Sequence, residues 1–116
     1  MEDGTIQIFV NSKGQIRLKK LGGFNNQPVI YGLELSIESV KQSGGTIISN
    51  TTSFLDDMGY VRYHFVVKRG EETNNPSYEW LDFEKIEEYI RHGKITQIEI
   101  IAALYLYRLS PFYYWK

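Results

Sequence analysis

The period of the hydrophobic pattern changes once along this chain, and that change constrains the fold more than any other feature. Up to Arg69, apolar and polar residues alternate, which places them on opposite faces of β-strands. After a polar break at residues 70–76, apolar residues recur at three- and four-residue spacing, which is typical of helices. The sequence therefore predicts an α+β fold in which the strands precede the helices.

Short turn sequences rich in Asn, Asp, Ser and Gly separate the predicted strands, and neighbours joined by short turns usually pair antiparallel. We therefore expect an antiparallel sheet of about five strands, arranged as a β-meander over residues 1–69 with one packed and one solvated face. In the last strand Val61, Tyr63, Phe65 and Val67 should face the core. The predicted strands are 5–11, 15–19, 29–38, 46–52 and 60–69.

A helical hairpin with an aromatic tail is predicted for residues 77–116, so that the whole of 1–116 forms a single domain. Asp82 is the expected N-cap of a helix over 83–92, and Gly93 its left-handed stop. Thr96 and Glu99 fit a capping box for a second helix over 98–109. At about 1.5 Å per residue that helix spans roughly 18 Å, short of a bilayer core of about 30 Å, so no membrane anchor is expected.

Charge and cysteine usage exclude several classes of function. The chain has 116 residues with 13 Lys and Arg against 14 Asp and Glu, which disfavours binding of long nucleic acids. It has no cysteine and begins with an acidic segment, so we expect a cytoplasmic protein without a signal peptide. Its histidines, His64 and His92, show no metal-binding spacing, and no catalytic motif is present. We predict no metal, no cofactor and no enzymatic activity.

Cationic and aromatic residues interleave along the chain, which has an aromatic content of 15%. Aromatic rings can stack on a base while guanidinium groups bind phosphates, so this pattern favours a small nucleotide-like ligand. The alternative is that these side chains decorate a solvated sheet surface. The predicted ligand-binding residues are Tyr60, Arg62, His64, Tyr78, Trp80, Arg91 and Arg108.

The second helix is apolar on every side, and an aromatic tail follows it. Such a helix must be covered all round, and aromatic residues are common in interfaces, so we expect a homo-oligomer. The alternative is an ordinary central core helix. The predicted interface residues are Ile101, Tyr105, Tyr107, Phe112, Tyr114 and Trp115.

An N-terminal sheet, a C-terminal helix pair and oligomerisation resemble, at the level of architecture, the sponge-type phage-encoded anti-defence proteins that counter Thoeris. The resemblance implies that an interface pocket sequesters a cyclic ADP-ribose-like signal without cleaving it, in the host cytoplasm. Residue usage rich in Ile, Lys, Asn and Tyr agrees with a phage or bacterial source. We therefore predict a non-enzymatic oligomeric binding protein. The alternative is a protein–protein inhibitor that blocks a host protein, such as a defence nuclease, through Glu84, Glu87 and Glu88 or the aromatic tail.

Overall fold

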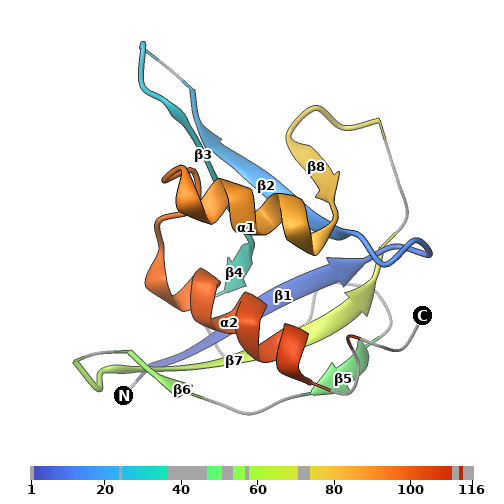
Figure 1. Cartoon of the computed structure of the whole chain (residues 1–116). Helices are drawn as coiled ribbons and strands as arrows, with labels where there is room; N and C mark the ends of the chain where they lie inside the picture. Colours follow the sequence, from blue (N-terminus) through green and yellow to red (C-terminus); the bar gives the residue numbers. More distant parts are fainter. Residues whose placement is uncertain are drawn as a thin grey trace.

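The computed structural model describes residues 2–23, 25–36, 47–50, 54–56, 58–70, 74–110 and 113, and contains eight strands followed by two helices (Figure 1). The strands are β1 (Glu2–Val10), β2 (Ile16–Gly22), β3 (Val29–Gly32), β4 (Glu34–Ser36), β5 (Ile47–Asn50), β6 (Phe54–Leu55), β7 (Val61–Arg69) and β8 (Tyr78–Leu81). The helices are α1 (Phe83–Arg91) and α2 (Ile98–Leu109). The predicted α+β class and the predicted C-terminal helix pair are confirmed.

All the strands belong to one mixed sheet, so the predicted antiparallel meander is wrong. The order along the main path is β3-β2-β1-β7-β5, while β4 pairs with β1, β6 with β7 and β8 with β2. β1 and β7 run parallel over their full length, and the other pairs are antiparallel. Alternation identifies a strand but does not identify its partner, and β1 has both of its edges paired: β7 lies along one, and β2 and β4 share the other.

The predicted strand over 29–38 is divided at Leu33. Its first part, β3, pairs with β2, whereas its second part, β4, pairs with β1 between Thr5 and Gln7. Residues 37–38 lie outside the described residues. The strands β6 and β8 were not predicted, because each is short and carries little alternation.

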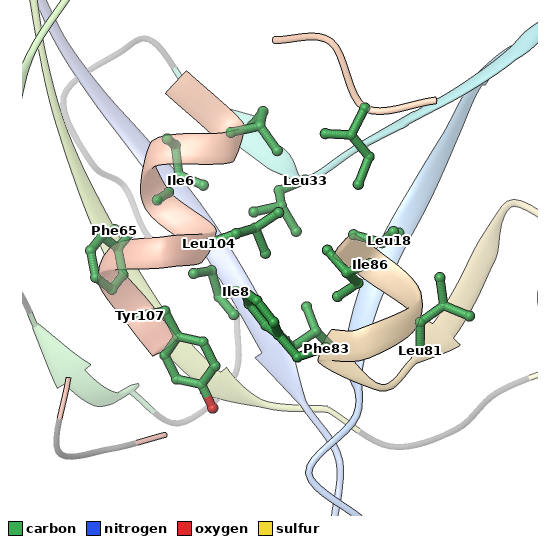
Figure 2. Close-up of a cluster of buried hydrophobic side chains, with 14 of the residues drawn as sticks. Ile6, Ile8, Leu18, Leu33, Phe65, Leu81, Phe83, Ile86, Leu104 and Tyr107 are labelled. Carbon is green, nitrogen blue, oxygen red and sulfur yellow. The ribbon is translucent and has the colours of Figure 1, made fainter. Parts of the chain in front are cut away.

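The core lies between the helices and one face of the sheet. Figure 1 shows α1 over β2 and α2 over β1 and β7, and Figure 2 shows the side chains that fill the layer between them. The register places Ile6 beside Phe65 and Ile8 beside Val67, and all four are buried. Val61, Tyr63, Phe65 and Val67 face this core as predicted.

Both helices begin close to their predicted positions, but neither start uses its predicted side-chain cap. Asp82 is the N-cap of α1 and makes no capping hydrogen bond with its side chain, and α2 starts after Gln97 instead of after a capping box at Thr96. The buried residues of α2 are Ile100, Ala103, Leu104 and Tyr107. Its opposite side leaves Ile98 75% and Leu109 80% exposed, so α2 is covered on its sheet side and open along part of its other side.

Candidate functional site

The face of the sheet away from the helices, which we call the second face, carries most of the polar side chains of the central strands. Ile6 and Ile8 point to the helices, so the residues that alternate with them point the other way. The strand register extends this assignment to the neighbouring strands. Its members are Thr5, Gln7, Phe9, Arg17, Lys19, Glu34, Arg62, His64, Val66, Lys68, Tyr78 and Trp80.

The predicted ligand-binding residues fall into three groups. Four of them gather on the second face: Arg62, His64, Tyr78 and Trp80. Tyr60 lies in the turn before β7 and is 68% exposed. Arg91 and Arg108 lie on the helices, on the opposite side of the sheet. The structure therefore places the cations of β7 and the aromatic rings of β8 on one face, on strands that are separated by β1 and β2, and it places both helical arginines on the opposite side.

Arg17 occupies a central position on the second face that the sequence did not single out. Its guanidinium carbon lies 3.9 Å from the centroid of the Phe9 ring and 4.0 Å from that of Tyr78, so the group is held between two aromatic rings. Alternation predicted that Arg17 points outward. Alternation within β2 did not indicate the contacts with the Phe9 and Tyr78 rings, because these rings come from β1 and β8.

A single carboxylate, Glu34, links the polar groups next to Arg17. The hydroxyl of Tyr78 donates a hydrogen bond of 2.7 Å to Glu34 Oε1. Arg17 and Lys19 form longer ion pairs with the same carboxylate, at 3.9 and 3.7 Å. The hydrogen bond to Glu34, followed by burial, raises the pKa of Tyr78. Glu34 therefore fixes the ring of Tyr78, which in turn covers one side of Arg17.

The remainder of the second face is partly or wholly buried. Lys68 is buried, with its ammonium nitrogen 5.9 Å from the centroid of the Phe9 ring. The Oε1 atom of Gln7 is buried and has no hydrogen-bond partner among the described residues. His64 Nε2 and Thr5 Oγ1 are 2.9 Å apart and hydrogen-bonded. The second face thus carries a row of polar side chains along its strands, next to aromatic rings.

Gly70 allows Trp80 to reach this row. A Cβ atom at position 70 would lie 2.7 Å from Cη2 of Trp80 and 3.3 Å from Cβ of Phe9. Real Cβ contacts are not that short, so only glycine lets Trp80 and Phe9 pack against the end of β7 as they do. Trp80 and Phe9 therefore form adjacent walls at the Arg17 end of the second face.

A separate cavity of about 280 Å³ lies on the helix side, between the β1–β2 turn and the ends of the helices. Arg108 lines it and lies 4.7 Å above the centroid of the Phe83 ring, while donating a hydrogen bond of 3.4 Å to the hydroxyl of Tyr113. The other lining residues are Lys13, Gly14, Asp82 and Glu84. Cations and carboxylates both line this cavity, whereas the second face gathers cations around one described carboxylate.

Among the described residues, those predicted to form the interface do not make one exposed surface. Tyr107 is only 3% exposed and belongs to the core, because its position in the turns of α2 points it at the sheet. Ile101 and Tyr105 are partly buried against the core, and the hydroxyl of Tyr105 donates to Glu87 at 3.2 Å. Phe112, Tyr114 and Trp115 lie outside the described residues. Oligomerisation stays a prediction.

The described part of the chain shows neither a metal-binding cluster nor a membrane-spanning helix. No group of three or more His, Asp or Glu side chains is placed to hold a metal ion there. No helix among the described residues is long and apolar enough to cross a membrane.

Comparison with known proteins identifies the fold. No family model matches the sequence, and no curated protein matches it. A solved structure described as "Crystal structure of ADP compounds hydrolase" is similar with a TM-score of 0.67 and 10% sequence identity, covering 92% of this chain and 71% of that chain. At that identity the likeness shows a shared fold.

This likeness contradicts the predicted function. We had predicted a non-enzymatic protein, either a sequestering oligomer or an inhibitor of a host protein, from the lack of catalytic motifs. The fold is instead shared with an enzyme that acts on ADP compounds, so the prediction of a non-enzymatic protein is wrong. The resemblance to phage anti-defence proteins is tested by none of these comparisons and stays a prediction. The chain has the fold of a solved ADP compounds hydrolase.

Proposed function

We propose that this protein is a hydrolase that acts on a compound containing an ADP group, and that it binds this compound on the second face of its sheet. The fold shared with an ADP compounds hydrolase supports the class of reaction. The gathering of cations and aromatic rings on the second face supports the class of ligand, because it provides partners for both a diphosphate and a base.

The observation that carries the proposal is the charge balance of the second face. Arg17 and Lys19 lie beside Tyr78, Arg17 also contacts Phe9, and Glu34 is the one carboxylate among the described side chains there. An anionic diphosphate would be attracted to these cations. The rings of Trp80 and Tyr78 are half-buried on the same face, and a ring with an accessible side can stack on adenine.

Hydrolysis of a phosphoanhydride places water on phosphorus, breaks the bond to the leaving oxygen and leaves negative charge on both products. Fixed cations lower the barrier to this reaction by stabilising the charge as it develops. A group that moves the proton of the attacking water adds to the rate, and imidazole is the side chain most often used. His64 is half-buried on the second face, where Thr5 Oγ1 holds its Nε2 atom at 2.9 Å. We assign this proton transfer to His64.

The test is turnover of ADP compounds by the purified protein. ADP-ribose and ADP-glucose would be incubated with the protein, with and without Mg²⁺, and nucleotide products measured by anion-exchange chromatography. We expect several product molecules per protein molecule, and His64→Ala should lower the rate by about 10²-fold or more.

The matched control is His92→Ala. His92 is exposed at the C-terminal end of α1, on the far side of the sheet from His64, so this variant should keep the native rate. Binding of both compounds without any product would refute the hydrolase, and equal rates for the two histidine variants would refute the role of His64.

A further inference from the structure

We propose that Arg17 is the group that binds the phosphates of the ligand. In the free protein Arg17 forms an ion pair with Glu34, and a phosphate replaces this contact when the ligand binds. This inference deepens the proposed function and rests on it for the identity of the ligand. Its geometry comes from three strands that meet at one end of the second face: β1, β2 and β8.

The two rings fix the orientation of the Arg17 side chain. The guanidinium carbon lies 3.9 Å from the centroid of the Phe9 ring and 4.0 Å from that of Tyr78, so two rings pack against the group. The side chain is only 20% exposed. A free arginine loses much rotamer entropy when it binds a ligand, and this one has already lost it on folding. The N–H donors of a guanidinium lie along the edge of its plane.

The N–H donors of Arg17 can bind a further acceptor. Within the described part of the chain the guanidinium makes no hydrogen bond to a protein acceptor, and its ion pair with Glu34 is 3.9 Å long. A hydrogen bond from arginine to an oxyanion is about 2.7–2.9 Å long. Two parallel donors match two oxygens of one phosphate, a fit that the ammonium group of lysine cannot reproduce. The geometry therefore favours an anion with paired oxygens that approaches in the plane of the guanidinium.

Glu34 is held in place by a different group. Its shortest contact is the 2.7 Å hydrogen bond from Tyr78, while its contacts with Arg17 and Lys19 are both longer than 3.5 Å. A phosphate can therefore bind Arg17 and Lys19 in place of Glu34, while Glu34 keeps its hydrogen bond with Tyr78. The negative charge of Glu34 then opposes the phosphate. Replacing it by glutamine removes that charge and keeps an oxygen that accepts from Tyr78.

The test measures the affinities of the whole protein for ADP and for adenosine by calorimetric titration. It requires no measurement of turnover. The native protein should bind ADP more tightly than adenosine. Arg17→Lys keeps the charge and removes the paired donors, so it should weaken ADP binding by about tenfold or more and leave adenosine binding within twofold. Glu34→Gln should strengthen ADP binding. Arg91→Lys, at an exposed position on α1, is the matched control and should change neither affinity.

Several results would overturn the assignment. Equal affinity of the native protein for ADP and adenosine would show that no phosphate is bound, and this needs no variant. Equal loss of both ligands in Arg17→Lys, with the variant folded by circular dichroism, would give Arg17 a structural role only. Weaker ADP binding in Glu34→Gln would refute the competition with phosphate. The Arg17 dependence can hold even if no product forms, so this assignment and the hydrolase fail in different experiments.

Discussion

The parallel pairing of β1 with β7 can be tested at Gly4. This residue is buried opposite Tyr63 in the register, and a Cβ atom there would lie 2.7 Å from Cδ1 and Cε1 of the Tyr63 ring. Tyr63 is buried and packs against Phe54, with ring centroids 5.7 Å apart, so its ring has little room to move. Gly4→Ala should therefore destabilise the protein.

The size of the effect follows from two opposing terms. Overpacking of a buried site costs about 1–3 kcal/mol. Alanine also restricts the unfolded chain, which offsets about 0.4–1 kcal/mol of this cost. The net loss in the free energy of unfolding is then roughly 1–2 kcal/mol, and for a chain of this length the melting temperature should fall by about 4–8 °C.

Thermal unfolding followed by circular dichroism measures this change directly. The control is the same substitution in a Tyr63→Ala background, where the ring is gone and Gly4→Ala should cost almost nothing. A melting temperature of Gly4→Ala equal to or above that of the native protein would show that the Tyr63 ring does not cover Gly4. The parallel register of β1 and β7 would then be wrong.

Three further substitutions test the core, the alkaline limit of stability and the second face. Leu104→Ala removes a fully buried side chain and should cost about 2–5 kcal/mol in urea unfolding; a cost below 1 kcal/mol would contradict its place in the core. Burial, followed by the hydrogen bond to Glu79, raises the pKa of Tyr89 from 10.0 to about 12, so the unfolded chain loses this proton first. The stability that this adds is present below pH 10 and is lost as the pH rises to about 12, and Tyr89→Phe should flatten that decline in melts between pH 9 and 12. Gly70→Ala should displace the Trp80 ring and shift the tryptophan emission, and an unchanged spectrum would refute their close contact.

The sequence predicted which way side chains point better than it predicted which strands pair. The alternation of Ile6 and Ile8 in β1 and of Phe65 and Val67 in β7 gave the buried face correctly, because burial of one face imposes a period of two wherever the strand goes. The same alternation does not indicate which strands pair with each other. The short turn after β1 suggested a long hairpin, yet the described register of β1 with β2 consists of the pair Val10 and Ile16, and β7 takes the full length of the other edge.

The candidate site was predictable only in part for the same reason. His64, Tyr78 and Trp80 were found because each lies next to other cations or rings in the sequence or on its own strand. Arg17 and Phe9 were missed although both point to the second face, since the site around Arg17 is completed by Tyr78 of the unpredicted strand β8.

The pairing of β2 with β8 determines what surrounds Arg17. From Ile16 to Lys19, β2 pairs with β8 on the edge opposite β1, so Arg17 has Phe9 of β1 on one side and the side chains of β8 on the other. The unpredicted strand β8 therefore supplies Tyr78, whose ring packs against the guanidinium of Arg17. The hydroxyl of the same residue donates the hydrogen bond that keeps Glu34 next to Arg17.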